Sequence, residues 1–427
     1  MEEYKESGID WIGKIPKNWD IQPLGVCFDE RREKVSDTLF EPLSVTKKGI
    51  LKQLDNVAKS DAHDDRKKVC KDDFVINSRS DRKQSCGLSD YDGSVSLINT
   101  VLISNKKMLE PIFVKYLLDN CMFAEEFYRN GHGIVADLWT TNYTEMKRIY
   151  IPIPSKREQK QIADFLDEKV GKIDKILEDL NKQIEILKKY RNNIIYESTT
   201  YGIENTADLI YTDNIFYKKT HKNWHLVALK RLTKVLTCGV ASTPEYTDKD
   251  NGILFLSAQN IQNNKLDLST KNYIPSELHK KITKYTKPQY GDVLQVRVGA
   301  TIGKSAIVDI KDEFSIYVSL TLMRVNEKIN NKYLNYVIST DQFKQMVSLD
   351  VDFAGSQGNL NVGDLKETKI PLPDYKEQIK IINYLDEKCS NIDKTIQIKQ
   401  KQIDKLENYK KSLIYEYVTG KKRVKEE

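Results

Sequence analysis

The chain has 427 residues, of which 30% are charged and 39% are hydrophobic. This length fits two or three domains, and the composition is that of a globular protein with more than one core, which excludes disordered and fibrous classes. The 68 Lys and Arg residues exceed the 62 Asp and Glu residues by 6, which permits a local basic surface but does not by itself indicate nucleic acid. No apolar run reaches about 18 residues, so a membrane-spanning helix is excluded.

Residues 1–150 make up the first predicted domain. Its polar, acidic beginning lacks the pattern of a signal peptide, and we expect a cytoplasmic protein. Runs of β-branched residues that follow turn residues predict strands within 71–79 and 94–98, and a helical stretch is expected over 112–128. These patterns predict an α+β domain with a mostly β core.

Basic and amide side chains gather around the predicted turns of this domain. Arginine can bond guanine through two parallel hydrogen bonds, and glutamine or asparagine can bond adenine in the same way. For any single residue a solvated loop is the simpler interpretation, whereas for the clusters as sets DNA contact and a solvated surface remain open alternatives. The candidate DNA-binding residues of the first domain are Arg66, Lys67, Lys68, Arg79, Arg82, Lys83 and Gln84.

Residues 151–201 form a helical module that recurs at 370–427. In an alignment with an offset of 219 residues, 12 of the 24 positions in 151–174 are identical in 370–393. Such identity is beyond chance over so short a stretch. It indicates duplication of two large units rather than a solenoid of short repeats.

Each module has the pattern of a long helix with a coiled-coil seam. Apolar residues recur at alternating spacings of four and three, charged residues fill the positions between them, and Ser155 and Asp374 are the predicted N-caps. Each helix could lie on its own domain or pair with the other, and the matched register favours pairing, which in one chain is most easily antiparallel. The predicted helix-pairing residues are Leu166, Val170, Ile173, Leu177, Leu180, Ile184, Leu187, Leu385, Ile392, Ile396, Ile403, Leu406 and Leu413.

Residues 202–369 make up the second predicted domain, which shares the motif Lys-Asn-Trp with the first domain, at 222–224 and 17–19. Strands are predicted within 290–297 and 316–320, and a helical stretch over 332–349. An amide-rich run and two polar glycine-containing loops carry side chains suited to base edges. The candidate DNA-binding residues of this domain are Gln259, Asn260, Gln262, Arg297, Thr301, Lys304, Ser356, Gln357 and Asn359.

Residues 370–427 form the distal helical module and a basic tail. The distal seam carries Cys389 and Lys399 where apolar residues are expected, which weakens any claim that the coiled coil is strong by itself. The Lys-rich run at 421–423 is interpreted as a solubilising end rather than as a DNA contact.

Motifs for catalysis or metal binding are absent from the sequence. The run 299–304 resembles a phosphate-binding loop, but it has one residue too few between its glycines. His221 and His225 lack an acidic third ligand, and the six cysteines are scattered, which is typical of reduced thiols. No glycine-rich turn of a nucleotide or S-adenosylmethionine fold is found. We therefore predict no catalytic residue, no metal site and no cofactor bound by this chain.

The repeated arrangement resembles the specificity subunit of type I restriction-modification enzymes. The resemblance rests on the duplicated module, with its Pro-x-Pro, Glu-Gln and Leu-Asp-Glu-Lys motifs, and it covers essentially the whole chain. The opening run resembles the usual start of that family's first domain, and the two domains resemble two different types of target-recognition domain. Where the family usually has Gly-Asp before a strand, this chain has Asp72-Asp73. The segments that carry the resemblance are 6–19, 43–45, 73–77, 87–89, 255–261, 291–294 and 299–304.

The resemblance implies two globular target-recognition domains separated by two long helices that pair as an antiparallel coiled coil. Each domain would read one half of a bipartite, asymmetric site in double-stranded DNA, and the helices would set the spacer. Two methyltransferase subunits and a motor-nuclease restriction subunit are the implied partners, which would bring S-adenosylmethionine, ATP and Mg. A tandem DNA-binding adaptor and a coiled-coil scaffold that serves another enzyme are the alternatives.

Overall fold

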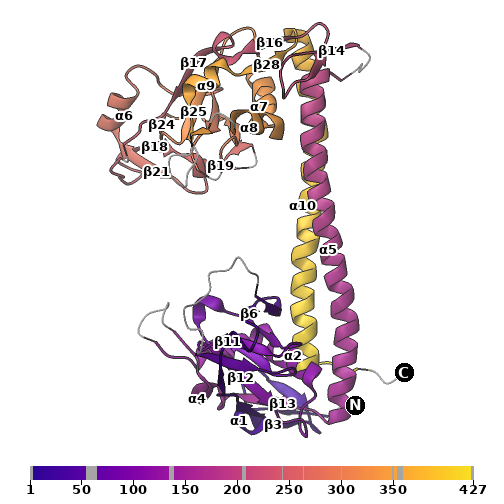
Figure 1. Cartoon of the computed structure of the whole chain (residues 1–427). Coiled ribbons are helices and arrows are strands. Elements are labelled where there is room, and N and C mark those ends of the chain that lie inside the picture. Colours follow the sequence, from indigo (N-terminus) through magenta and orange to yellow (C-terminus); the bar gives the residue numbers. More distant parts are fainter. Residues whose placement is uncertain are drawn as a thin grey trace. The chain divides into compact units, whose positions relative to one another are not determined.

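The computed structural model describes residues 3–53, 65–133, 139–203, 208–242, 244–262, 264–299, 301–348, 351–352 and 359–424. Two compact units make up the chain, and we call them the first unit (residues 1–181 and 400–427) and the second unit (residues 182–399). Both divisions lie within the two longest helices, α5 (Lys156–Tyr201) and α10 (Tyr375–Val418). Each unit therefore combines one globular domain with a part of both helices (Figure 1).

A four-stranded sheet forms the centre of the first unit, in the order β10-β9-β12-β4. Along β9, Phe74 and Ile76 face the core beneath the helices, whereas Val75 joins a smaller core on the opposite face, as the two-residue period of a strand requires. A second sheet of the first unit has three strands in the order β11-β8-β5. The bounds are β4 Phe28–Glu30, β5 Lys34–Val35, β8 Arg66–Val69, β9 Phe74–Asn77, β10 Cys86–Leu88, β11 Gly93–Ser96 and β12 Asn99–Ser104.

The second unit repeats this arrangement with the sheets β23-β22-β25-β17 and β21-β18-β24. In each central sheet the strands come in the same chain order, so the two central sheets share one topology. The smaller sheets differ, since β18 pairs with β24 in parallel whereas β8 is antiparallel to both of its neighbours. The mixed helix and sheet content confirms the predicted α+β class. The bounds are β17 Thr233–Cys238, β18 Gly252–Leu256, β21 Asn272–Pro275, β22 Val293–Val296, β23 Ser305–Ile307, β24 Phe314–Ile316 and β25 Leu320–Val325.

The helical stretch predicted for each domain is present and is divided into two helices. Asn120 separates α2 from α3 because its side chain accepts hydrogen bonds from the first backbone N–H groups of α3. Thr340 does the same between α7 and α8, where its hydroxyl accepts from the backbone N–H of Phe343 at 3.2 Å. The bounds are α2 Pro111–Leu118, α3 Cys121–Arg129, α7 Asn331–Ser339 and α8 Asp341–Ser348.

Smaller elements complete the two units. A strand from the start of each domain pairs with the strand that precedes the long helix, β3 with β13 and β16 with β28. In the first unit the bounds are β1 Tyr4–Glu6, β2 Lys14–Pro16, β3 Asp20–Pro23, α1 Leu24–Cys27, β6 Leu43–Thr46, β7 Gly49–Lys52, η1 Ser80–Arg82, α4 Tyr143–Met146 and β13 Tyr150–Ile153. In the second unit they are β14 Leu209–Tyr211, β15 Lys219–His221, β16 His225–Ala228, η4 Leu229–Arg231, η5 Ala258–Asn260, β19 Ile261–Gln262, β20 Lys265–Leu266, α6 Ser276–Ile282, β26 Val351–Asp352, β27 Asn359–Leu360, α9 Val362–Glu367 and β28 Lys369–Leu372.

Both predicted N-caps of the long helices are confirmed. The hydroxyl of Ser155 accepts from the backbone N–H of Glu158 at 3.3 Å, and the Glu158 carboxylate accepts in return from the backbone N–H of Ser155. Asp374 accepts from the backbone N–H of Glu377 at 2.9 Å. These bonds satisfy donors that the first turn of a helix leaves without partners, which explains where α5 and α10 begin.

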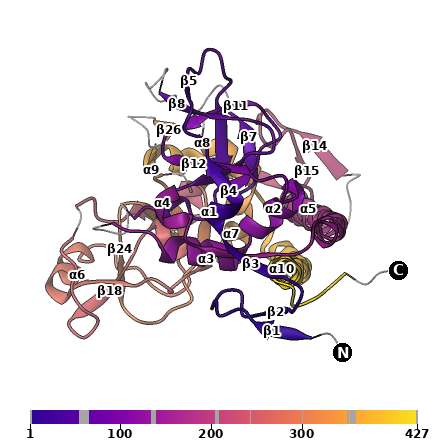
Figure 2. The same cartoon turned by 90° about the horizontal axis from the view of Figure 1, so that it is seen from below.

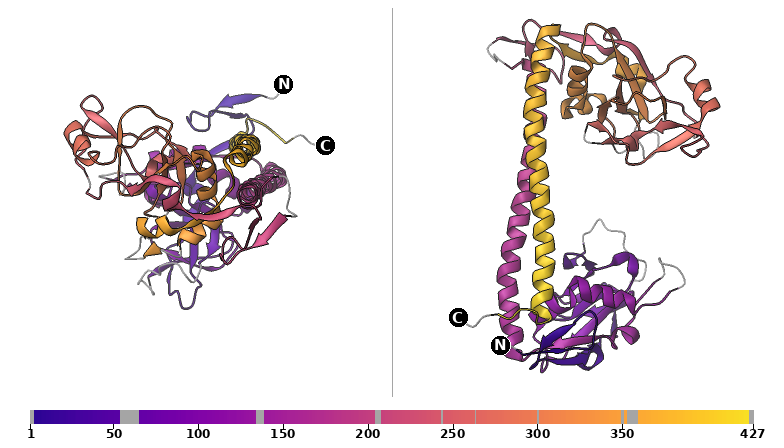
Figure 3. Two further views of the ribbon diagram at one scale, coloured as in Figure 1. Left: turned by 90° about the horizontal axis from the view of Figure 1, so that it is seen from above. Right: turned by 180° about the vertical axis from the view of Figure 1, so that it is seen from behind.

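Within each unit α5 and α10 lie side by side and run antiparallel (Figures 1 and 3). In the first unit the rings of Phe165 and Tyr417 have centroids 4.5 Å apart, and Lys410 Nζ lies 2.6 Å from Asp174 Oδ1. In the second unit the same pairing joins Lys399 to Gln183 at 2.6 Å. The polar seam position Lys399 thus has a partner on the opposite helix.

Every predicted seam residue is buried or half-buried, but not by helix pairing alone. Leu166, Val170 and Ile173 of α5 belong to the core of the first unit's domain, together with Leu413 of α10. Leu385 is likewise part of the core of the second unit's domain. The two alternatives for the helices therefore both hold, since each helix packs on a domain and on its neighbour. None of the helices among the described residues combines the length and apolar character that a membrane crossing needs.

The basic tail packs on the first unit instead of projecting as a solubilising end. Lys421 Nζ donates to the carbonyl oxygen of Lys14 at 2.7 Å, and Arg423 pairs with Glu158, which also accepts from the indole N–H of Trp19 at 3.3 Å. The start of the chain and the end of α10 accordingly lie together in Figures 2 and 3. These contacts tie both termini to the same unit.

Candidate DNA interface

The two predicted clusters occupy equivalent places in the two units. The run that begins at Arg79 follows β9, and the run 299–304 follows β22, the matching strand. At this end of each central sheet a turn leads into the next strand, β12 in the first unit and β25 in the second. In the first unit the backbone N–H of Ser78 donates to the carbonyl of Ile98 in this turn, at 3.3 Å. We call these two places the first edge and the second edge.

The first edge lies beside a groove of about 720 Å³, which we call the first groove. Four basic side chains line it, and Glu30 is the one acidic residue among the described residues that do so. Glu30 accepts from Lys67 Nζ at 3.0 Å and from Arg32 Nε at 2.8 Å. Burial alone would raise the pKa of Glu30, but these two bonds outweigh it and lower the pKa, so the carboxylate stays ionised. The basic residues of the first groove are Arg32, Lys34, Lys67 and Arg79.

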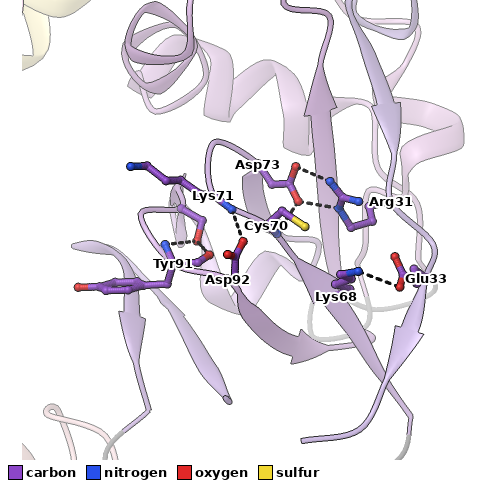
Figure 4. Close-up of polar contacts among 9 residues, drawn as sticks. Arg31, Glu33, Lys68, Cys70, Lys71, Asp73, Tyr91 and Asp92 are labelled. Carbon is purple, nitrogen blue, oxygen red and sulfur yellow. Dashed lines mark hydrogen bonds and ion pairs between the residues drawn. The ribbon is translucent and has the colours of Figure 1, made fainter. Parts of the chain in front are cut away.

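Of the candidates on β8, Arg66 requires a correction. Its side chain is buried, with Nε donating to Ser94 Oγ at 2.9 Å and Nη2 to the Ser94 carbonyl at 3.1 Å, and burial lowers its pKa. A guanidinium held in this way joins two strands and is not presented to DNA. Lys67 lines the first groove, whereas Lys68 Nζ is bonded to Glu33 at 3.0 Å (Figure 4).

The candidates that follow β9 are more accessible. Arg82 is exposed and its Nε lies 3.7 Å from Asp81, while Arg79 Nε lies 3.3 Å from the same carboxylate. Lys83 pairs with Glu125, and Gln84 has a backbone φ of +60°, which places it at a tight turn. This segment can present cations to a phosphate backbone, whose contacts carry much of a DNA-binding protein's affinity.

Two candidates of the second unit, Asn260 and Arg297, also require correction. Asn260 is 1% exposed, and its amide donates to the carbonyls of Asp267 and Thr270. Arg297 is 8% exposed and donates from Nε to the Leu360 carbonyl at 2.9 Å. Both side chains form hydrogen bonds that hold loops together, so neither is placed to contact a base edge in this structure.

Four other candidates gather at the second edge. Lys304 Nζ donates to Gln262 Oε1 at 3.4 Å, and Gln262 in turn donates to the backbone carbonyl of Gln259, which is itself exposed. Thr301 lies half-buried in the same turn as Lys304. Ser356 and Gln357 fall outside the described residues. The backbone of Asn359 belongs to β27.

At the end of β9 and β22 opposite to each edge, each unit has a buried aspartate paired with an arginine. Asp73 accepts from Arg31 Nε at 2.7 Å and Nη2 at 3.0 Å, as Figure 4 shows. Asp292 accepts from Arg324 in the same two-bond geometry, at 2.8 Å and 2.8 Å. These carboxylates raise the pKa of both arginines, because they stabilise the guanidinium in its charged form.

The departure from the usual Gly-Asp pattern has a simple geometric explanation. Asp72 has a φ of +70°, and Gly291, at the matching position, has a φ of +86°. The turn before the strand thus needs a left-handed residue in both units. Aspartate is one of the few side chains that tolerate this conformation, so the replacement keeps the turn.

Sequence reasoning missed several residues of the first groove. Arg32, Lys34 and Asn142 line it, as do the apolar residues Leu97 and Ile98. Arg32 and Lys34 lie in a basic run that could have been noticed, whereas Asn142 lies 110 residues further along the chain than Arg32 and carries no local signal. Among the residues that the structure describes, no three His, Cys, Asp or Glu side chains are grouped to hold a metal ion.

Comparison with known proteins identifies the same architecture. A family model for the type I restriction modification DNA specificity domain matches residues 66–194 and 221–408. The type I restriction enzyme MjaVIII specificity subunit of Methanocaldococcus jannaschii is 26% identical, in a match that covers 65% of this chain and 63% of that protein. The putative MjaX specificity subunit of the same organism is 24% identical over 100% of this chain and 99% of that protein.

A solved structure has a similar fold. One chain from a study of complex assembly and conformational transition of the type I R-M system has a TM-score of 0.71 at 17% identity. The match covers 95% of this chain and 98% of that chain. This likeness supports the two-domain arrangement with its long helices. The chain spans slightly less than two thirds of the length of the MjaVIII subunit, and nearly all of the MjaX subunit.

Proposed function

Because this chain belongs to the family of type I restriction-modification DNA specificity domains, we propose that it is the non-catalytic subunit that selects the DNA sequence for a type I complex. Each domain reads one half of a bipartite, asymmetric site in double-stranded DNA. One observation carries this proposal: the two units share a scaffold but present different side chains at the same edge. Arg79 and Arg82 lie at the first edge, and Gln259 and Gln262 at the second.

We propose further that two methyltransferase subunits dock on the long helices and that a motor-nuclease restriction subunit joins them. The support is that α5 and α10 expose large apolar side chains away from their seam, including Ile176 (47% exposed), Ile186 (64%) and Ile398 (59%). Exposed apolar groups on charged helices suit a protein partner better than DNA. S-adenosylmethionine, ATP and Mg would bind to these partners, in the cytoplasm.

Replacement of one domain by that of a relative tests the proposal. We would exchange residues 1–150, express the chain with its methyltransferase subunit, and map methylated bases in genomic DNA. The expected result is a motif in which one half changes and the other half stays. The reciprocal exchange of residues 202–369 is the control. If both halves changed together, or if no methyltransferase subunit copurified, the chain would serve as an adaptor or scaffold for something else.

The spacer role of the helices has its own test. Seven residues inserted after Lys182 and seven after Lys399 keep the Gln183–Lys399 pair together and preserve the seven-residue seam. Seven residues lengthen a helix by about 10 Å, and base pairs rise by about 3.4 Å each. We expect unchanged half-sites with about three more base pairs between them. Methylation of the original spacer at full rate would show that the helices only dock partners.

A further inference from the structure

The turn between β11 and β12 presents two apolar side chains at the first edge. Leu97 is 37% exposed and Ile98 is 46% exposed. β11 and β12 pair with different strands, so their connection is not a tight hairpin. Turns in general are built mostly from Gly, Pro, Asn, Asp and Ser, so turn chemistry does not explain two large apolar residues at this place. They do not fill a core either, since neither belongs to the packed clusters of the first unit.

The backbone of this turn is held from both sides. The N–H of Ser78 donates to the carbonyl of Ile98 at 3.3 Å, and Lys67 Nζ donates to the carbonyl of Asn99 at 2.9 Å. The Asn99 amide donates to the carbonyl of Ser96 at 3.0 Å. The two apolar side chains are therefore displayed by a fixed turn, which reduces the conformational entropy that a contact would cost.

The surroundings of the turn are basic. Leu97 and Ile98 line the first groove with its four cations. A second hollow of the first unit, about 540 Å³, is instead lined by Asp10, Glu125 and Glu126, with Arg129. The apolar turn thus lies in the hollow that attracts a polyanion and not in the acidic one.

We propose that the Leu97–Ile98 turn contacts the methyl group of a thymine in the half-site read by the first domain. This inference rests on the proposed function. The 5-methyl group is the apolar feature of a base pair in the major groove, and it distinguishes thymine from the other bases. Less than half of each residue is exposed, so the turn reaches a surface group of a base and does not wedge between stacked base pairs.

The second unit provides an internal contrast. Its matching turn is Val318-Ser319, because the backbone N–H of Arg297 donates to the Ser319 carbonyl at 2.9 Å, as that of Ser78 does to the Ile98 carbonyl. Val318 is half-buried, and Arg297 Nη1 donates to its carbonyl at 3.3 Å. Ser319 is only 8% exposed, and its hydroxyl accepts from the backbone N–H of Ala258 at 3.0 Å. This turn is bound into its own domain, so the methyl contact is specific to the first half-site.

The test uses the complex of this chain with its methyltransferase subunits and a duplex that carries the methylated motif. Each thymine in turn is replaced by deoxyuridine, which removes only the methyl group, and the Kd is measured. Loss of one buried methyl is expected to weaken binding about fourfold at a thymine of the first half-site. Every replacement in the second half-site should change binding less than about twofold.

Variants then assign the effect to the turn. In Ile98→Ala or Leu97→Ala the uracil penalty should disappear, whereas Ile98→Val should retain most of it. Ile112→Ala is the matched control, because Ile112 is 42% exposed on α2 and does not line the first groove. An unchanged penalty in both alanine variants overturns the assignment to this turn.

Two outcomes separate the inference from the function on which it rests. Sequence-specific binding by the wild-type complex with no uracil penalty in the first half-site, or a first half-site without any thymine, overturns the methyl contact alone. Failure of the complex to bind or methylate any bipartite sequence overturns the proposed function. The uracil series on the wild-type complex decides between them without requiring any variant to fold.

Discussion

The two units are alike where they are buried and different where they are exposed. Gln159 and Gln378 show the likeness: each is fully buried, accepts one backbone N–H (from Glu110 and Asn330, both at 2.8 Å), and donates to two backbone carbonyls. At the edges the likeness ends, since cations line the first groove and amides with one lysine gather at the second edge. Duplication thus preserved the contacts that join each helix to its domain and left the edges free to diverge.

One difference between the two units lies in buried residues. In the first unit Cys86 Sγ donates to Asp119 at 3.4 Å, and burial raises the pKa of Asp119 from its usual 3.8 to about 6. At the matching places the second unit has Ser305 and Ser339, and neither can ionise. The units should therefore respond differently to pH although they share a frame.

The largest expected effect tests the aspartate–arginine pairs at the starts of β9 and β22. Asp73→Ala and Asp292→Ala should each lower the free energy of unfolding by about 3–5 kcal/mol, because three hydrogen bonds to a buried carboxylate are lost, two from a half-buried guanidinium and one from a backbone N–H. Urea unfolding measures both. Lys188→Ala, at an exposed helix pair, is the control and should change little. A large loss of stability in one of the two aspartate variants and none in the other would show that the two pairs are not equivalent.

The junction glutamines come next. Gln159→Leu and Gln378→Leu should each cost about 3 kcal/mol, since three backbone groups lose their partners in a buried place. Gln402→Leu on the exposed face of α10 serves as the control. Thermal unfolding of the three variants would show whether the two helix–domain junctions contribute equally, and a negligible effect at either site would contradict the comparison.

The pH difference should be smaller. A pKa raised by burial means that Asp119 favours the folded state at low pH and that this contribution is lost as pH rises from about 4 through about 6. Asp119→Asn should match the wild type near pH 4 and exceed its stability by about 2 kcal/mol near pH 7. Ser339→Ala should show no such pH dependence. If the free energies of unfolding of the wild type and of Asp119→Asn changed in parallel with pH, a raised pKa of the Asp119 carboxyl would be ruled out.

The smallest effects are expected at the edges. Arg82→Ala should weaken DNA binding a few-fold for every sequence and reduce the slope of log Kd against log salt by about 1, as a phosphate contact does. Gln259→Ala should instead relax the sequence preference in the second half-site only. Binding titrations at several salt concentrations, with matched and mismatched duplexes, distinguish the two. Identical behaviour of both variants would remove the contrast between the edges.

Local patterns in the sequence were sufficient for the repeated frame. The duplicated module, the α5 and α10 seam and the caps at Ser155 and Asp374 are readable because a helix buries residues at fixed spacings and needs a polar residue before its first turn. The strands at 74–77 and 293–296 follow turn residues for the same local reason. These features depend on neighbours within a few positions.

Only the tertiary structure decided which polar side chains are exposed and which are held inside a domain. Arg66 donates to Ser94, 28 residues away, and Arg297 donates to the carbonyl of Leu360, 63 residues away. Arginine is a residue type that suits base contacts, but these two side chains are structural. The first groove is assembled from strands, turns and the Asn142 segment that meet only after folding. The exposure of a side chain depends on elements that are distant in the sequence and pack against it. The periodicity of residues along one element does not indicate which elements these are.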